Sequence, residues 1–280
     1  MKRFSFVFIL PIVLMLLGCG PQVEPPVTES VDTDVDVAEV IADSQQPAEP
    51  CQLTMGFDAW EPYQYIGVGN VVTGLDVEIV HAVAEEMGCT IAMHQATWVE
   101  LLNALRSGEV DFVLGASLTK DRKQFAYFSD PYREERFILY VRRYEGSMSY
   151  QNITEFVKAG HKLGIVNEYY YGDEITRLYN NDEYHAQFVG AIISEMNMAR
   201  LIDEEIDGFL EDSFVGASIL RRKGLDQFIE PHGINLGSSE VYVMFSQHSV
   251  SEEMVSAFNK GLQQIKADGS YQQIIQKYDH

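Results

Sequence analysis

Short segments with two different hydrophobic periods alternate along most of the chain, and this alternation limits the fold more than any other feature. Apolar runs such as Leu53–Phe57 and Val110–Leu114 have the length of buried strands. Between them, segments such as Asp76–Met87 place apolar residues three or four positions apart and then reach a glycine, as amphipathic helices do. The alternation predicts an α/β fold of parallel sheets covered by helices. Functional residues are expected directly after strands, where ligands bind in such sheets.

The pattern continues to the C-terminus. The sequence at 97–100, Thr-Trp-Val-Glu, is a capping box that opens a helix. The residues from 51 onward exceed one average domain and suit two small lobes. Further strands are expected at 90–94, 137–143, 162–166, 187–189, 206–210, 227–229 and 241–245, and further helices at 119–124, 255–266 and 271–278.

The N-terminus has the pattern of a secretory signal. Two basic residues precede an apolar run at 4–17, which is too short for a membrane span of about 20 residues. The run ends in Leu-Leu-Gly-Cys at 16–19, which resembles the lipobox of bacterial lipoproteins. The resemblance implies that residues 1–18 are a cleaved signal peptide and that lipidated Cys19 anchors the protein to a membrane, in the periplasm or at the cell surface. A plain signal peptide that contains a cysteine is the alternative.

The segment that follows has a different composition. Residues 20–50 hold five of the nine prolines and eight acidic residues, with no basic and no aromatic residue. Such a segment cannot bury enough apolar surface to offset its ordering entropy, so residues 19–50 are predicted to form a disordered acidic tether. A calcium loop is the alternative, but the glycine and distal glutamate of an EF-hand loop are missing.

Charge and cysteine usage limit the partners. The formal net charge of −22 disfavours nucleic acid and anionic lipid surfaces. Cys51 and Cys89 each precede an expected strand, and if those strands are parallel neighbours, a disulfide is geometrically reasonable in an oxidising compartment. Two buried free thiols are the alternative. No metal site is expected, because these cysteines have no clustered histidines beside them.

Six short motifs after residue 55 occur in an informative order and spacing. They are at 56–63, 73–78, 117–122, 128–132, 206–212 and 267–271. Together they resemble the bacterial extracellular solute-binding proteins of family 3, which are type II periplasmic binding proteins of polar amino acid ABC importers. The resemblance implies two parallel-sheet lobes, 51–141 plus 237–280 and 142–236, joined by a two-segment hinge near Arg142 and Gly237 that closes on ligand.

Three loop positions match the family's contacts with the ligand backbone. Arg122 is expected at a helix start, where a guanidinium fork suits a carboxylate, and the family's matching arginine holds the α-carboxylate. Gly115 and Ser117 match a carbonyl and a hydroxyl that contact the ligand. Asp212 matches an acid that pairs with the α-ammonium. The alternatives are a solvated surface arginine, a strand-end turn at Gly115, and a helix N-cap at Asp212.

The remaining candidates surround the ligand side chain. Asp58 follows the first strand, and the aromatic residues Trp60, Tyr63 and Trp98 would attract a cation and exclude water, or else belong to the core. After the strand at 162–166 the family has glycine and then threonine or serine, but this chain has Asn-Glu-Tyr-Tyr-Tyr-Gly at 167–172. The hydroxyl clamp is therefore missing, and Glu168, Tyr169 and Tyr170 join the candidate site.

The leading hypothesis is that a monomer captures an amino acid and delivers it to an ABC permease without a cofactor or a chemical step. The surplus of acids over Arg122 favours a ligand with extra positive charge, such as arginine, lysine, ornithine or a related amine. An enzyme like the cyclohexadienyl dehydratases, which share the architecture, is the first alternative, with Glu168 as the candidate acid. A ligand-sensing lipoprotein is the second.

Overall fold

The structure is a computed structural model that describes residues 51–144 and 149–278. They belong to one compact unit, 49–280. The predicted signal peptide at 1–18, the predicted lipidation of Cys19 and the predicted tether at 19–50 lie outside the described residues. Within the described ranges, none of the helices has both the length and the apolar character that crossing a membrane requires.

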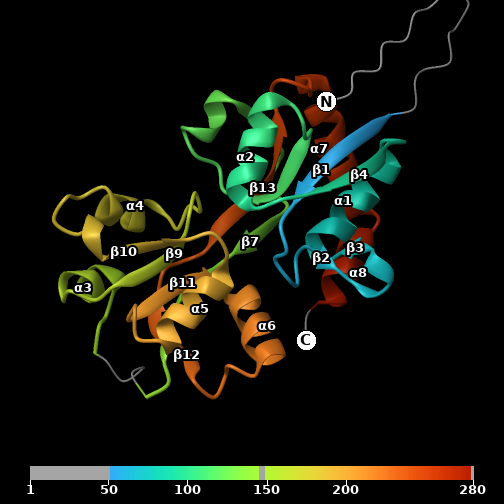
Figure 1. Ribbon diagram of the computed structural model, residues 1–280. Helices are drawn as coiled ribbons and strands as arrows, with labels where there is room; N and C mark the ends of the chain where they lie inside the picture. The colour runs from blue at the N-terminus through green and yellow to red at the C-terminus, as the bar shows by residue number, and fades with distance from the viewer. Residues whose placement is uncertain (1–50, 145–148, 279–280) are drawn as a thin grey trace, which may run out of the picture. The chain divides into compact units, whose positions relative to one another are not determined.

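The first sheet has six strands in the described part of the chain (Figure 1). β1 runs parallel to β4 and β5, whereas β13 runs antiparallel to β5, β6 and β7. β2 (Tyr65–Ile66) and β3 (Val72–Thr73) pair separately, with the 3₁₀ turn η1 (Val68–Asn70) between them. The strands in order across the sheet are β4 (Thr90–Gln95), β1 (Gln52–Phe57), β5 (Phe112–Ala116), β13 (Ser239–Ser246) and β6 (Ala126–Phe128), with β7 (Arg133–Glu135) also paired to β13.

Helices cover both faces of this sheet because its strands alternate their buried side chains. Phe112 and Leu114 of β5 belong to the cluster that includes α1 and α7, while Val113 between them belongs to the cluster of α2. α1 contacts α7 and α8, and α2 contacts β1, β5 and β13. The bounds of these helices are α1 (Leu75–Glu86), α2 (Trp98–Ser107), α7 (Glu252–Ala267) and α8 (Ser270–Gln276).

The second sheet has five strands in the described residues and the same layered construction (Figure 1). Phe209 of β11 packs in the cluster that includes α5 and α6, and the next residue, Leu210, packs with α3 and α4. β9 is parallel to β10 and β11, and β8 is antiparallel to β11 and β12. The elements are β10 (Phe188–Ala191), β9 (Leu163–Val166), β11 (Gly208–Asp212), β8 (Phe137–Arg142) and β12 (Ile229–Asn235), with α3 (Ile153–Lys158), α4 (Asp173–Tyr179), the 3₁₀ turn η3 (His185–Gln187), α5 (Ser194–Ile202) and α6 (Ser213–Lys223).

The predicted α/β class is confirmed, but both sheets are mixed rather than purely parallel. The expected crossover near Arg142 also differs from the strand pairing, because 137–142 forms β8 between β11 and β12 in the second sheet. The chain therefore leaves the first sheet at Arg136, between β7 and β8. The apolar run of β8 is buried among second-sheet residues, and this packing decides its place. The return lies between β12 and β13, a stretch that contains Gly237.

Two local predictions, a helix and a disulfide, can be compared with the structure. The helix expected at 119–124 is only a single 3₁₀ turn, η2 (Arg122–Gln124), because β6 begins at Ala126 and leaves no room for more. The disulfide is confirmed: Cys51 and Cys89 are bonded, with their Cα atoms 4.5 Å apart. β1 and β4 are parallel neighbours with Gln52 opposite Thr90, so the two cysteines start side by side.

Candidate functional site

One cavity is lined by residues from both sheets and their loops, and it lies where β1 and β5 end. The space in it that the centre of a water molecule can reach is about 30 Å³. Its predicted lining residues are Asp58, Trp60, Trp98, Gly115, Ser117, Arg122, Tyr169 and Tyr170. Lining residues that the sequence did not predict are Gln64, Leu114, Glu135 and Phe137.

Arg122 is buried, and its guanidinium donates hydrogen bonds to neutral carbonyl groups. The residue is only 7% exposed. Its Nη1 donates to the Ser117 carbonyl at 2.9 Å, and its Nη2 donates to the Glu168 carbonyl at 2.7 Å. The guanidinium also lies 5.3 Å from the ring centre of Trp98. Burial lowers the pKa of Arg122 to about 10, which leaves it cationic at neutral pH. Among the described residues no carboxylate forms an ion pair with it, so the site suits an incoming anionic group.

The local backbone places Arg122 differently from the sequence prediction. The turn η2 is too short to supply the helix dipole that the prediction used. Instead, the amide of Arg122 donates to the hydroxyl of Thr119 at 3.2 Å. Two carbonyl oxygens then fix the guanidinium, so orientation comes from hydrogen bonds rather than from a helix start.

Gly115 allows the aromatic wall to approach the backbone. Its φ of +70° lies in the left-handed region that favours glycine. A Cβ at this position would lie 3.1 Å from Cζ3 of Trp60, so any larger residue meets that ring. The indole of Trp60 thus packs directly on the end of β5.

Tyr169 fills the space between the two tryptophans. Its ring centre lies 6.1 Å from both Trp60 and Trp98, in edge-to-face geometry with each. The indole Nε1 of Trp98 donates to the Glu168 carbonyl at 3.2 Å. The loop after β9 therefore forms one wall of the cavity through Tyr169 and through the backbone of Glu168.

Carboxyl groups surround the cavity. Asp58 is half-buried, its carboxylate accepts the Ala59 amide at 2.8 Å, and burial raises its pKa to about 6. Glu135 is 3% exposed, and its Oε1 accepts the hydroxyls of Ser117 at 3.1 Å and Ser239 at 3.4 Å. Burial raises the pKa of Glu135 to about 7, against the opposing effect of Arg133. Acids in this setting favour a cationic group as their partner.

Glu211 is a further buried acid beside the cavity. Its Oε1 accepts the Trp60 indole at 3.3 Å, and among the described residues its Oε2 has no hydrogen-bond partner. Burial raises the pKa of Glu211 to about 7. Glu211 lies on β11 of the second sheet and Trp60 lies in the segment after β1 of the first sheet, so this hydrogen bond joins the two halves of the site.

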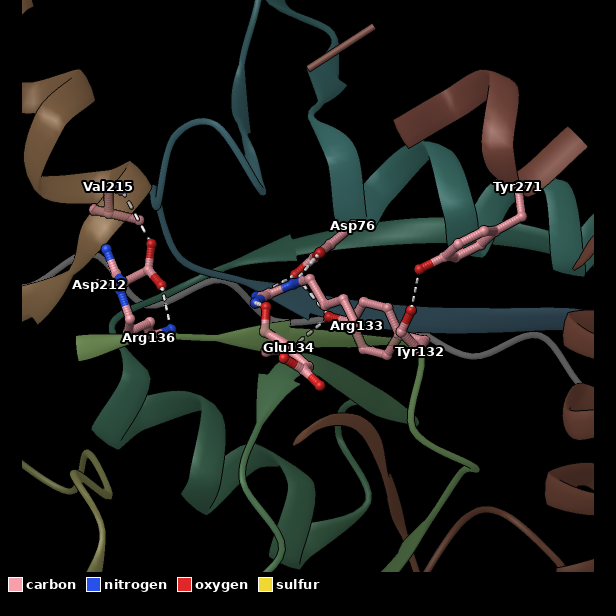
Figure 2. Close-up of polar contacts among 9 residues, drawn as sticks. Asp76, Tyr132, Arg133, Glu134, Arg136, Asp212, Val215 and Tyr271 are labelled. Carbon is pink, nitrogen blue, oxygen red and sulfur yellow. Dashed lines mark hydrogen bonds and ion pairs between the residues drawn. The ribbon is translucent and has the colours of Figure 1, made fainter. Parts of the chain in front are cut away.

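Asp212 lies outside the cavity lining and caps α6. Its Oδ1 accepts the amides of Phe214 at 2.9 Å and Val215 at 3.2 Å, and its Oδ2 accepts the Arg136 amide at 3.4 Å. Figure 2 shows the carboxylate between Val215 and Arg136, away from the Asp76–Arg133 group. This arrangement matches the N-cap alternative, in which the carboxylate accepts backbone amides at the start of α6.

Two other predicted residues also lie outside the lining. The Glu168 side chain is exposed, and this residue acts through its carbonyl from a left-handed backbone with φ of +64°. The ring of Tyr63 lies under the Arg133 guanidinium, 3.6 Å from its centre to the guanidinium carbon. Neither side chain meets the cavity directly.

A buried ion pair supports the floor of the site. Arg133 Nε lies 2.7 Å from Asp76 Oδ1, and Nη2 lies 3.0 Å from Oδ2 (Figure 2). The Tyr132 hydroxyl donates to Asp76 Oδ2 at 2.6 Å and accepts the amide of Gly115 at 3.0 Å. The pair thus fixes the end of β5. Asp76 lies in the sequence motif at 73–78, whereas Arg133 and Glu135 were not among the predicted site residues.

One sequence signal points to these missed residues. The run Arg-Glu-Glu-Arg at 133–136 lies between buried Tyr132 and Phe137. Charged residues at inward positions of a strand between apolar neighbours are costly unless paired, so they mark a site or a buried network. Within the described residues, no group of three or more potential ligands could hold a metal ion.

Comparison with known proteins identifies the family. The model of the bacterial extracellular solute-binding proteins, family 3, matches residues 53–279. The chain belongs to this family. A probable histidine-binding protein of Neisseria gonorrhoeae is 28% identical to this family member over 224 residues, which are 78% of each chain. An arginine-binding periplasmic protein of Mannheimia haemolytica is 25% identical, over 79% of this chain and 87% of the relative.

Solved structures share the fold of this family 3 protein. The arginine-, lysine-, histidine-binding protein ArtJ of Geobacillus stearothermophilus matches with a TM-score of 0.69 and 21% identity, over 81% of this chain and 95% of the other. A histidine kinase sensor domain similar to periplasmic binding proteins matches with a TM-score of 0.72 and 22% identity, over 82% and 96%. At these identities the structural likeness extends to the fold alone.

Proposed function

We propose that the protein binds an amino acid with a basic side chain in this cavity and delivers it to an ABC importer unchanged. The decisive observation is that buried Arg122, which has no carboxylate partner among the described residues, shares one cavity with Asp58 and Glu135. A zwitterion with an additional positive charge complements this set of one cation and several acids. The names of the relatives, histidine- and arginine-binding proteins, support the same ligand class.

Each part of the ligand has a partner of suitable chemistry. The ligand carboxylate replaces the Glu168 carbonyl at Arg122 Nη2 and gains two parallel hydrogen bonds from the guanidinium. The cationic side chain lies between the rings of Trp60 and Trp98 and points to Asp58. To admit it, Tyr169 moves from its position between these rings, which means that the loop after β9 adjusts on binding.

The cellular setting belongs to the same proposal. The lipobox pattern at 16–19 supports anchoring through Cys19 outside the cytoplasmic membrane, where a monomer on an acidic tether meets its permease. Recognition of this kind requires no chemical step. Incubating the protein with L-arginine, arogenate or prephenate is therefore expected to return each compound unchanged by mass spectrometry.

A thermal-shift screen of the standard amino acids and polyamines tests the proposal, followed by calorimetric titration of the compounds that stabilise the protein. We expect arginine, lysine or histidine to give the largest shift, and Arg122→Ala to abolish the binding. The matched control is Lys123→Ala, which removes a neighbouring exposed cation and leaves binding intact. A screen in which no amino acid shifts the unfolding temperature would reject the proposal.

A further inference from the structure

Glu135 lines the same cavity as Arg122, and the sequence assigned it no role. We propose that Glu135 holds the α-ammonium of the ligand and so determines specificity for amino acids over other anions. This inference rests on the proposed function and names the second half of the same site. Glu135 lines the cavity, lies on β7 and is 3% exposed, so its carboxylate faces the ligand rather than solvent.

Ser117 links the two proposed partners of the ligand. Its hydroxyl donates to Glu135 Oε1 at 3.1 Å, and its carbonyl accepts Arg122 Nη1 at 2.9 Å. The carboxylate and ammonium of an α-amino acid are attached to a single carbon, so the groups that bind them must lie next to each other. Ser117 contacts both Arg122 and Glu135 and so holds them near each other.

The alternative acid, Asp212, is already engaged. Its Oδ1 caps α6 through two amides, and its Oδ2 accepts the Arg136 amide. Asp212 does not line the cavity. In Glu135, by contrast, both hydrogen bonds that reach the carboxylate from the described residues end on Oε1, which leaves Oε2 for a ligand donor.

The surroundings of Glu135 make its ionisation sensitive to a bound cation. Because its pKa is about 7, a large fraction of Glu135 is protonated at about pH 6, and an adjacent ammonium favours the charged form. Ligand binding at that pH therefore releases a proton. The titratable groups that face Glu135 are Arg133 on its own strand, Asp76 on α1, Arg122 in η2, Asp212 at the end of β11, and the phenols of Tyr169 and Tyr171.

The test compares ligands with and without the α-amino group. L-arginine and 5-guanidinopentanoic acid, which is arginine without that group, are titrated calorimetrically into the wild type, Glu135→Gln and Glu134→Gln, with L-lysine and L-histidine in parallel. Glu134 neighbours Glu135 on β7 but is exposed, which makes it a matched control. A third variant, Asp212→Asn, keeps an N-capping side chain.

We expect removal of the α-amino group to weaken binding by about tenfold or more in the wild type and in Glu134→Gln, but to change little in Glu135→Gln. Asp212→Asn is expected to behave like the wild type. Equal losses in the wild type and Glu135→Gln overturn the inference while leaving the proposed function intact. A loss of discrimination in Asp212→Asn alone also overturns it. Failure of all three amino acids to bind the wild type overturns both.

A measurement on the wild type keeps the inference testable if Glu135→Gln does not fold. Calorimetry at about pH 6 in buffers of different ionisation enthalpy gives the number of protons released on binding. We expect arginine to release more protons than 5-guanidinopentanoic acid, because the α-ammonium alone reaches Glu135. Identical proton release for the two ligands contradicts the inference.

Discussion

At the scale of single residues, the main feature of this site is that its charged side chains are buried away from solvent. Arg133 and Asp76 neutralise each other with side chains that are 4% and 0% exposed, whereas the Arg122 guanidinium donates only to carbonyl oxygens among the described residues. The first pair needs no ligand, because its charges are compensated within the protein. Arg122 and the carboxyl groups around the cavity instead fit charges that arrive with a ligand.

Asp76→Asn tests the structural role of the buried pair. Its removal leaves Arg133 as an uncompensated buried cation, so we expect a loss of about 3–5 kcal/mol in unfolding free energy by denaturant titration. Glu78→Gln is the matched control on the first turn of the same helix, since it breaks the partly exposed pair with Lys277, weakens the hydrogen bond from Tyr278, and costs about 1 kcal/mol or less. Equal effects of the two substitutions would contradict the assigned role of Asp76.

Sequence reasoning identified site residues where a motif marks them. Arg122, Ser117 and Trp60 lie within the motifs that resemble the family, and all three line the cavity. Glu135 lies three positions after the end of the motif at 128–132. Arg133 pairs with Asp76, which is 57 positions away in the sequence. Such a pairing depends on the packing of α1 against β7, which no local pattern encodes. Asp212 shows the converse, because an acid at a strand end fits both a ligand contact and an N-cap.

At the scale of elements, the order of strands and helices follows from apolar periodicity, but their assignment to a sheet does not. The runs of β1, β4, β5, β9 and β11 were predicted close to their observed bounds. β8 was also predicted, but it was expected in the first lobe, because periodicity reports that a strand is buried and not which sheet buries it. The two-stranded β2–β3 pair and the three-residue strands β6 and β7 were missed, since so few residues give no periodic signal.

The disulfide fixes the first two parallel strands of the first sheet. Replacing Cys51 and Cys89 by serine removes a link across a sequence separation of 38 residues. We expect the double variant to lose about 2–4 kcal/mol in unfolding free energy, and we expect reductant to destabilise the wild type by a similar amount. If reductant shifts both proteins equally, the bond does not contribute as described. Ligand affinity measured on the folded variant is expected to change little, because the bond is remote from the cavity lining.

At the scale of the whole molecule, buried acids link stability to pH. Burial raises the pKa of both Glu135 and Glu211 to about 7, above the ordinary glutamate value. Between the ordinary value and about 7 the folded state holds more protons than the unfolded state, so the free energy of unfolding falls as the pH rises through this window. The net charge of −22 adds self-repulsion in the same direction.

Thermal unfolding from about pH 5 to about pH 8 measures this linkage. We expect the midpoint temperature of the ligand-free protein to decrease across the range, and we expect a saturating basic amino acid to reduce the slope, because it stabilises ionised Glu135. Glu135→Gln should lose part of the slope and Glu134→Gln none. A midpoint that rises with pH in this window would contradict the raised pKa values.

The proposed lipid anchor is also tested on the whole chain. If Cys19 is lipidated, Cys19→Ser moves the protein from the membrane fraction to the soluble fraction of the cell envelope. Binding of L-arginine by the purified variant is expected to equal that of the wild type, since the residues that line the cavity begin at Asp58, far along the sequence from Cys19. Retention of the variant in the membrane fraction would contradict the lipobox interpretation.

The role of Arg122 in binding the ligand carboxylate is tested most directly by comparing each basic amino acid with the amine that remains when its carboxylate is removed. Arginine and agmatine, lysine and cadaverine, and histidine and histamine are titrated into the wild type and into Arg122→Ala. If Arg122 binds the ligand carboxylate, at least one amino acid binds the wild type and its amine binds about tenfold or more weakly. Arg122→Ala is expected to lose this preference. Equal affinity of the wild type for an amino acid and its amine would contradict the assignment of Arg122 to the ligand carboxylate.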